Sequence, residues 1–304
     1  QKLKIFLKIL FQFHEKYQLR YIYKPHHARH RIILIFRHIR RKFRRLSFLK
    51  FVDKTSSKIF NHQRLNKRYF CTYGDDNFIK SRERIINEAR ITGLFDECFF
   101  YSNLNLPGNE FLKKKIESSF FLEVASSERI GGCGLWKPYI ILKTLEELNN
   151  GDILVYSDAG CKIETDKKSI FQFESLILEI EKSSLGLIGI KEPFIEKHWT
   201  KGDVFKYFKV YQDPEFTDTS QFCSGRIHII KKCNHASKIY SYWWKVAKER
   251  PDLFYDSPSI VPNLNGFMEN RHDQSVWSLI CKKFEVIEKK DIDLFFVEPA
   301  RIRE

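Results

Sequence analysis

Two acidic residues stand where the sequence pattern could present a carboxylate to a ligand, and the first is Asp158. It follows residues 153–156, an uncharged run of β-branched, aliphatic and aromatic residues that is typical of a strand buried on both faces. Gly160 comes two positions later, where a ligand could approach the backbone closely. Because open α/β sheets bind ligands just outside the carboxyl ends of their strands, Asp158 is the first candidate for a functional residue. The alternative is a turn aspartate that caps the next element.

The second acidic residue is Asp273, in the cluster Asn-Arg-His-Asp-Gln at 270–274, directly before a predicted helix at 275–282. A histidine beside an aspartate at a helix start offers a metal ligand and a base. Alternatively, Asp273 caps the helix and His272 is an ordinary surface residue. The functional interpretation is favoured, because a strand-end carboxylate and a His-Asp pair from a late loop can converge on one cation.

Glycine-rich and cationic segments accompany these carboxylates. The loop at Gly74, the loop at 131–137 and Asp158 fall at the ends of predicted elements, which a doubly wound sheet would gather at one edge. Such an edge suits a nucleotide, since glycines admit phosphates, cations neutralise them and a carboxylate holds the ribose or a metal. The candidate phosphate partners are Arg82, Arg84 and Lys137. The alternative for Trp136 and Lys137 is a packing aromatic beside a surface lysine.

Several other chemistries find no support in the sequence. The dinucleotide fingerprint G-x-G-x-x-G, the P-loop and the serine-hydrolase motif G-x-S-x-G are all missing. The seven cysteines are odd in number and widely spaced, without a C-x-x-C pair, which indicates neither a zinc site nor a disulfide framework. This usage fits a reducing compartment.

The spacing of hydrophobic residues predicts an α/β fold. The chain has 304 residues, 43% of them hydrophobic, which is enough for one large or two small domains. Predicted strands alternate with predicted helices, as in a mostly parallel sheet flanked by helices. The strands are expected at 68–73, 98–101, 153–156, 186–190 and 226–230, with one or two edge strands at 284–299. The helices are expected at 81–92 (closed by Gly93), 109–123, 139–148, 168–182, 234–248 and 275–282. Residues 193–217 are expected to be irregular and aromatic-rich.

The charge is concentrated at one end of the chain. Residues 1–50 contain 15 Lys and Arg but a single acid, a net charge of +14 out of the chain's +15. They predict a basic amphipathic helical extension that binds an anionic membrane surface, or else helices packed on the body with their charges outward. The body at 67–304 is nearly neutral, which disfavours nucleic acid as a partner. Residues 51–66 are expected to be a linker. The sequence contains no uncharged apolar stretch long enough to span a membrane, and we expect no signal peptide.

Four segments together resemble a known family. They are Gly-Leu-Trp-Lys-Pro-Tyr at 134–139, Gly-Asp-Ile-Leu-Val-Tyr-Ser-Asp-Ala-Gly-Cys at 151–161, His-Asp-Gln-Ser at 272–275, and the Gly74 loop with the helix that carries Arg84. Over roughly residues 67–285 they resemble bacterial capsule and lipopolysaccharide-type glycosyltransferases of the GT-A fold. The resemblance implies transfer of a sugar from a nucleotide-sugar donor, such as a UDP-sugar, to a glycan or lipid-linked glycan acceptor in surface polysaccharide synthesis. The location would then be cytoplasmic, or peripheral on the inner face of the cytoplasmic membrane.

The resemblance also implies roles for the candidate residues. In GT-A enzymes a DxD-type motif at a central strand end binds the ribose and a divalent metal. Asp158 takes the first carboxylate position, but Gly160 stands where the second would be, so the motif is incomplete. His272 or Asp273 would supply the missing ligand for Mn²⁺ or Mg²⁺. The implied donor-binding residues are Gly74, Arg82, Arg84, Trp136, Lys137, Asp158 and Gly160.

The sequence leaves alternatives for the acceptor-binding residues and for the stereochemistry of the transfer. If the enzyme inverts, Asp273 is the candidate base, and if it retains, no such base is required. Ser220, Gln221 and the aromatic region 194–211 are the candidates for acceptor contact, since aromatic faces suit sugar rings. Two other functions remain as alternative hypotheses. The missing second acid favours a catalytically inactive nucleotide-sugar-binding module, and the extension at 1–50 favours a basic membrane- or nucleic-acid-binding protein.

Overall fold

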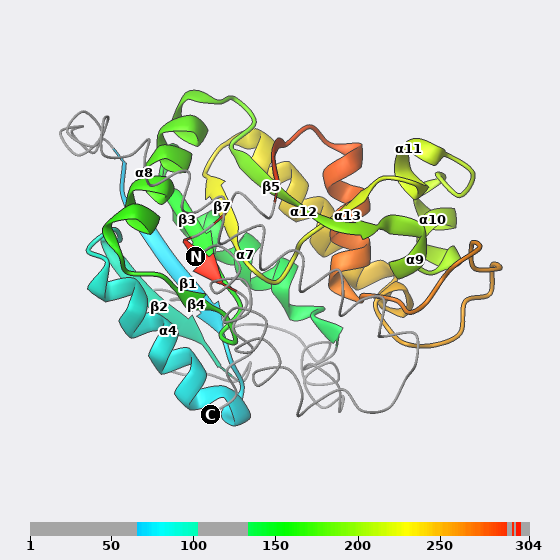
Figure 1. The fold of residues 1–304 in the computed structure, drawn as a ribbon, viewed down its shortest axis with the longest axis horizontal. Coiled ribbons are helices and arrows are strands. Elements are labelled where there is room, and N and C mark those ends of the chain that lie inside the picture. The colour runs from blue at the N-terminus through cyan, green and yellow to red at the C-terminus, as the bar shows by residue number, and fades with distance from the viewer. Residues whose placement is uncertain (1–65, 103–132, 291–293, 295, 299–304) are drawn as a thin grey trace, which may run out of the picture.

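The described part of the chain is one α/β body built on a seven-stranded sheet (Figure 1). The computed structural model describes residues 66–102, 133–290, 294 and 296–298. The extension at 1–50, nearly all of the linker at 51–66 and the helix predicted at 109–123 lie outside these residues.

The sheet has the strand order β2-β1-β3-β7-β5-β6, with β8 also paired to β5. The β1–β2, β1–β3 and β5–β8 ladders are parallel, whereas β3–β7, β5–β7 and β5–β6 are antiparallel. It follows that five strands run in one direction and only β6 and β7 run against them, so the expected mostly parallel sheet is confirmed. The strands are β1 (Arg68–Tyr73), β2 (Glu97–Tyr101), β3 (Ile153–Tyr156), β5 (Leu187–Ile195), β6 (Ser220–Phe222), β7 (His228–Lys231) and β8 (Ile287–Lys290). A separate pair joins β4 (Lys162–Ile163) to β9 (Val297–Glu298).

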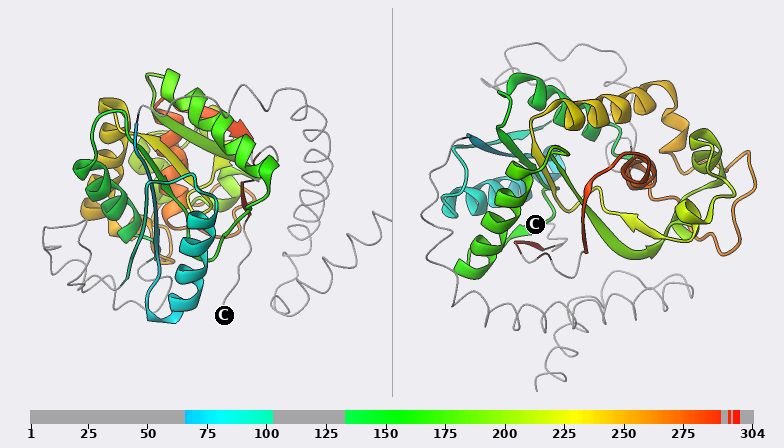
Figure 2. Two further views of the ribbon diagram at one scale, coloured as in Figure 1. Left: turned by 90° about the vertical axis from the view of Figure 1, so that its left-hand side faces the viewer. Right: turned by 90° about the horizontal axis from the view of Figure 1, so that it is seen from above.

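Helices cover both faces of the sheet (Figure 2). On one face lie α4 (Ile79–Ile91) and α8 (Lys167–Lys182), and on the other α7 (Trp136–Glu147), α12 (Asn234–Glu249) and α13 (Asp273–Lys283). Strand β3 shows how the pleat separates the two cores. Ile153 and Val155 pack toward α4 and α8, and Leu154 and Tyr156 pack toward α7, α12 and α13.

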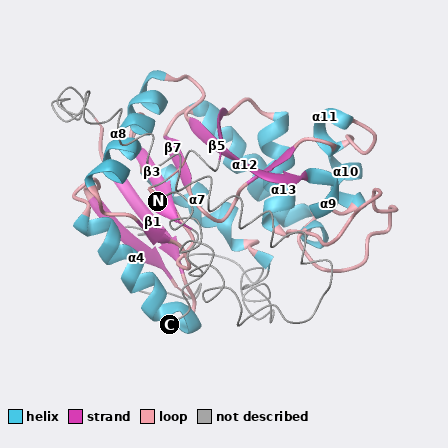
Figure 3. Ribbon diagram, in the orientation of Figure 1, coloured by secondary structure: helices cyan, strands magenta, loops and turns pink. Residues whose placement is uncertain are grey.

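The region expected to be irregular at 193–217 is partly helical, which corrects that prediction. Strand β5 continues to Ile195, and three short helices follow, α9 (Glu196–Trp199), α10 (Gly202–Phe208) and α11 (Pro214–Thr217) (Figure 3). Helix α11 has a local signal, since Asp213 accepts a hydrogen bond from the N–H of Glu215 and Pro214 takes the first position. Two 3₁₀ turns, Asp76–Phe78 and Pro251–Leu253, complete the described elements.

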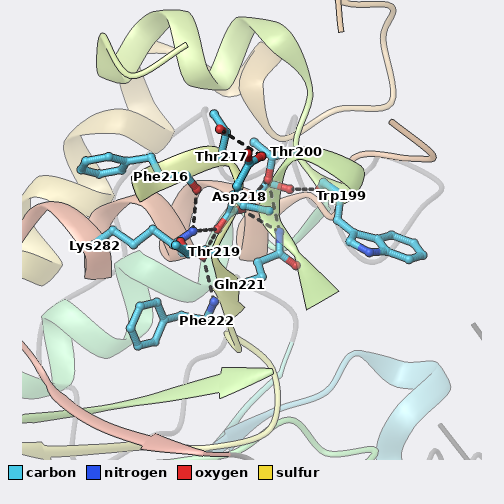
Figure 4. A network of polar contacts seen from close by, with 12 residues as sticks. Trp199, Thr200, Phe216, Thr217, Asp218, Thr219, Gln221, Phe222 and Lys282 are labelled. Atoms are coloured by element: carbon cyan, nitrogen blue, oxygen red, sulfur yellow. Dashed lines mark hydrogen bonds and ion pairs between the residues drawn. The ribbon is translucent and has the colours of Figure 1, made fainter. Parts of the chain in front are cut away.

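A buried polar network fixes α9 against α13 and β6 (Figure 4). The Glu196 side chain is fully buried, and it accepts hydrogen bonds from Lys282 Nζ at 2.7 Å, Thr200 Oγ1 at 2.6 Å and Gln221 Nε2 at 3.0 Å. Ser278 Oγ donates to the same carboxylate. The charges of Glu196 and Lys282 are therefore paired and hydrogen-bonded, and the network joins α13 to α9 and β6 through Ser278 and Lys282.

Among the described residues, none of the helices combines the length and the apolar character that crossing a membrane requires.

Candidate functional site

Lys137 lies between the two acidic residues that the sequence singles out. Its Nζ atom is 2.7 Å from Oδ2 of Asp273 and 3.2 Å from Oδ1 of Asp158. Lys137 is only 3% exposed, so the alternative of a surface lysine is wrong. The Asp158 side chain retains 40% of its exposure, whereas that of Asp273 retains 13%. One buried cation thus holds two carboxylates, of which Asp158 is the more open to a ligand.

Three elements position this triad of Asp158, Lys137 and Asp273. Lys137 is in the first turn of α7, Asp158 follows the carboxyl end of β3, and Asp273 is the first residue of α13. Two helix N-termini therefore meet at a strand end, and neither helix carries a side-chain cap. The partial positive charge of a helix N-terminus favours negative groups, both the carboxylates and an anionic ligand.

Neighbouring side chains hold the two carboxylates in place. The Tyr156 hydroxyl donates to Oδ1 of Asp158 at 2.6 Å, and Ser224 Oγ donates to Oδ2 of Asp273 at 2.9 Å. The backbone carbonyl of Ser224 accepts from Lys137 Nζ at 3.3 Å. The β6–β7 connection thus supports the triad from the side opposite α7.

Two glycines allow the backbone to lie directly against the carboxylates. A Cβ atom at Gly225 would stand 2.5 Å from Oδ2 of Asp158, and one at Gly134 would stand 2.7 Å from Cγ of Asp273. Gly134 also has a φ of +78°, which side-chain-bearing residues rarely adopt. The site needs glycine at both positions.

The triad shifts the pKa values of its members. Burial alone would lower the pKa of Lys137, but the attraction of Asp158 and Asp273 outweighs it and raises that pKa above its usual range. Burial raises the pKa of the Asp158 carboxyl, and the nearby Asp273 adds to this, while Lys137 opposes it. Lys137 is therefore a permanent cation at neutral pH.

His228 forms a hydrogen bond with Ser224 in the β6–β7 connection, and its ring packs among aromatic side chains. Its ring lies 4.8 Å from that of Trp277 and 5.8 Å from that of Trp243. Burial, followed by the charge of Lys137, lowers the pKa of His228 to about 3, so the imidazole is neutral. A carbonyl can only accept, so Nε2 carries the proton toward the Ser224 oxygen at 2.6 Å, and Nδ1 accepts from the Tyr240 hydroxyl at 2.7 Å.

Trp136 and the predicted residues of the Gly74 loop lie beside the triad as supports. Trp136 is buried and stacks on Tyr73 with ring centroids 4.0 Å apart, so it packs α7 onto the end of β1. Arg82 donates to the carbonyl of Gly74 at 2.9 Å and lies over the ring of Phe100. In this arrangement the side chains of Trp136 and Arg82 pack against other parts of the protein at the edge of the sheet.

The guanidinium of Arg84 is bound to protein groups. It pairs with Glu88 at 2.9 Å and donates to the carbonyls of Ala159 and Cys161 at 2.9 and 2.8 Å. Arg84 thereby holds the loop that follows Asp158. Gly160, within that loop, has nothing within 4 Å of where a Cβ would be, so its face is open.

The described residues do not fit the predicted metal site at Asp158 and His272. Nδ1 of His272 lies 2.9 Å from the carbonyl oxygen of Phe254, and Nε2 lies 3.7 Å from Asp256. Within residues 66–102 and 133–290, no three His, Cys, Asp or Glu side chains are grouped so that they could hold a metal ion. The space between Asp158 and Asp273 is taken by the ammonium of Lys137.

Ser220 and Gln221, the two candidates for acceptor contact, differ in how far they are exposed to solvent. Ser220 begins β6 and is partly exposed. Gln221 is fully buried, donates to Glu196 and Thr200, and accepts from Gln274 Nε2 at 2.7 Å. A glycan would not reach Gln221 in this arrangement, and the residue instead connects the Glu196 network to α13, which begins at the triad.

Sequence reasoning missed Ser224, Gly225, His228 and the role of Tyr156. Tyr156 and Asp158 have the i, i+2 spacing that puts side chains on one face of a strand, which is a usable signal. Ser224 and Gly225 stand at the start of a predicted strand, where a serine-glycine pair could have been recognised as a site loop.

Comparison with known proteins finds similarity only among solved structures. No model of a protein family and no curated protein matches the chain. The first similar structure is a glycosyltransferase involved in the glycosylation of the major capsid of PBCV-1, with 10% identity, coverage of 74% of this chain and 81% of that one, and a TM-score of 0.38. The galactosyltransferase LgtC in complex with donor and acceptor sugar analogs shows 12% identity, 73% and 72% coverage, and a TM-score of 0.36. Mouse xyloside xylosyltransferase 1 in its apo form shows 10% identity, 74% and 84% coverage, and a TM-score of 0.37. The proposals below rest on the residues of this chain.

Proposed function

We propose that this chain is a glycosyltransferase that moves a sugar from a nucleotide-sugar donor, such as a UDP-sugar, to a glycan acceptor. The observation that carries the proposal is the convergence of Asp158, Lys137 and Asp273 at the carboxyl end of β3. Ligands bind at this edge in open α/β sheets. The sequence resemblance to capsule and lipopolysaccharide-type enzymes supports the same reaction and suggests surface polysaccharide as the product.

The triad suits a donor that carries a diphosphate. The exposed carboxylate of Asp158 is a hydrogen-bond acceptor for the hydroxyls of a ribose, and Gly160 leaves the adjoining backbone open. The N-termini of α7 and α13 face the same place and favour phosphate oxygens. Trp136, Arg82 and Arg84 act as supports of this edge, rather than as phosphate ligands.

The reaction forms a bond between an acceptor hydroxyl oxygen and the anomeric carbon. The bond from that carbon to the diphosphate oxygen breaks, and the nucleoside diphosphate leaves with the electron pair. If the configuration inverts, Asp273 accepts the hydroxyl proton. If it is retained, the departing diphosphate takes that proton.

The test is turnover of a nucleotide-sugar panel by the full chain, measured as release of nucleoside diphosphate. Asp158→Ala should abolish release from the active donor while the protein stays folded at the assay temperature, although its melting temperature should fall because Lys137 loses one of its two carboxylate partners. The matched control is Glu146→Gln, which removes a half-exposed carboxylate on α7 at a surface ion pair. Full activity in Asp158→Ala would contradict the proposal.

An inactive nucleotide-sugar-binding module is the second candidate. Gly160 at the position of a second acid favours it. Under this alternative, a nucleotide-sugar would stabilise the protein in thermal melts without any release of nucleoside diphosphate.

Residues 1–50, with their net charge of +14, are proposed to bind an anionic membrane surface. The full chain should then sediment with vesicles of anionic phosphatidylglycerol and not with phosphatidylcholine alone, and salt should weaken the binding. Equal binding to both vesicles would contradict this part of the proposal.

A further inference from the structure

The cation of the candidate site is a side chain rather than a free ion. The ammonium of Lys137 contacts Asp158, Asp273 and the carbonyl of Ser224, which all belong to the site. It is 3% exposed and comes from the first turn of a helix that is buried along most of its length.

A divalent ion between the same carboxylates would meet strong opposition. Mg²⁺ and Mn²⁺ need oxygen ligands at about 2.0–2.2 Å, so an ion bound to Asp158 and Asp273 would stand next to the Lys137 ammonium. Like charges repel strongly at such separations when water is largely excluded. Displacing the ammonium instead would leave a buried cation unpaired, which is equally unfavourable.

Among the described residues, no further His, Cys, Asp or Glu side chain joins the two carboxylates in a group that could hold a metal ion. The backbones at Gly225 and Gly134 lie directly against Asp158 and Asp273, with no room even for a Cβ. The loop after Asp158 has Gly160 where a second acid would be, and among the described residues His272 does not form a metal-binding group with the two carboxylates. The hydroxyl and the carbonyl oxygen of Ser224 also lie at this point, but they are already hydrogen-bonded to Asp273 and to Lys137.

We propose that Lys137 is the resident cation of this centre and takes the place of a divalent metal ion between Asp158 and Asp273. While Lys137 is present, these carboxylates do not bind Mn²⁺ or Mg²⁺. The exclusion of a metal ion follows from the contacts of Asp158, Lys137 and Asp273 alone. Its consequence is that the donor binds without a divalent ion, and this consequence rests on the proposed function.

The direct test is a titration of the full chain with Mn²⁺, followed by electron paramagnetic resonance of the free ion. Wild-type protein and Asp158→Asn should show the same binding, since any Mn²⁺ on the wild type would be bound elsewhere. Mn²⁺ binding in the wild type that Asp158→Asn removes would overturn the proposal.

Removing the ammonium should open the site. Lys137→Met keeps an unbranched apolar side chain, one atom shorter than lysine, and removes the ammonium between the two carboxylates, so it should gain Mn²⁺ affinity of at least about tenfold over the wild type. Adding Asp158→Asn to Lys137→Met should abolish that gain. If Lys137→Met is poorly folded, Lys137→Gln serves in its place, because the amide can still donate to Asp273. A folded variant that gains no Mn²⁺ affinity would show that Lys137 is not what excludes the metal, and would overturn the proposal.

The consequence for the donor is tested separately by thermal melts with UDP and UDP-sugars, in EDTA and in Mn²⁺. An equal shift in both media supports donor binding without a divalent ion, and a shift only in Mn²⁺ contradicts it. No shift in either medium would contradict a UDP-sugar as the donor of the proposed function, while the Mn²⁺ titration would still decide whether the carboxylates bind a metal ion.

Discussion

The Nζ atom of Lys137 lies 2.7 Å from Oδ2 of Asp273, although 136 positions separate the two residues in the chain. This contact joins the first turn of α7 to the first residue of α13, and Asp158 completes it from the end of β3. The ammonium thereby connects two helices and the central strand at one point. It is a structural element of the fold as well as part of the candidate site.

Lys137→Met should therefore destabilise the protein by about 3–5 kcal/mol at neutral pH, since it leaves two carboxylates without their buried cation. The deficit relative to the wild type should shrink as the pH falls, because the carboxylates then take up protons and lose their charge. Chemical denaturation at pH 7.5 and pH 4.5 measures both values. An equal deficit at the two pH values would contradict the electrostatic account.

Gly225→Ala should impair the site by steric pressure alone. The new Cβ would stand 2.5 Å from Oδ2 of Asp158, so the carboxylate must move, and we expect turnover to fall at least about tenfold. Gly160→Ala is the control for stability, because nothing lies within 4 Å of its Cβ position and its melting temperature should stay unchanged. Wild-type turnover in Gly225→Ala would argue against any role for the present position of Asp158.

His228 should make the protein less stable in acid. Its pKa is about 3 in the folded state, well below that of an exposed histidine, so between about pH 6.5 and pH 3 only the unfolded state binds the proton. Stability should therefore fall with decreasing pH in this window, by at most about 1.4 kcal/mol per pH unit. His228→Gln removes the titration and should flatten the dependence, measured as unfolding free energy from pH 7 to pH 4. The same slope in both proteins would refute the assignment.

The Glu196–Lys282 pair should behave as a buried pair. Glu196→Gln and Lys282→Met should each cost about 3–5 kcal/mol, and the double variant should cost clearly less than their sum. The exposed pair of Lys143 and Glu146 provides the comparison, since Glu146→Gln should change stability by less than about 1 kcal/mol. Additive costs at Glu196 and Lys282 would show that the two side chains do not act together.

Much of the fold could be predicted from local patterns. Strands β1 and β3 begin and end where their β-branched and aromatic runs do, and Gly93 closes α4 with a φ of +64°. These features depend on period, side-chain type and turn chemistry, which the sequence contains. The short helices α9, α10 and α11 escaped prediction because four to seven residues give too few turns for a helical period to be visible.

The candidate site was predictable in its members but not in its arrangement. The strand-end position of Asp158 follows from the pattern, whereas nothing local indicates that Lys137 is buried, since lysine is usually exposed. His272 shows a second limit. Its backbone φ of +54° and its bond to the carbonyl of Phe254 depend on the packed loop, so the sequence alone could not predict where its ring would lie relative to Asp158.

We propose above all that Asp158, held by Lys137 and Tyr156, binds a nucleotide-sugar donor. Calorimetric titration of UDP and of the active UDP-sugar into wild-type protein and Asp158→Asn, in buffer with EDTA, tests it most directly. We predict measurable binding to the wild type and a loss of at least about tenfold in affinity in Asp158→Asn, with both proteins folded at the temperature of the titration. Wild-type affinity in the variant, or no binding of any nucleotide-sugar to the wild type, would contradict it.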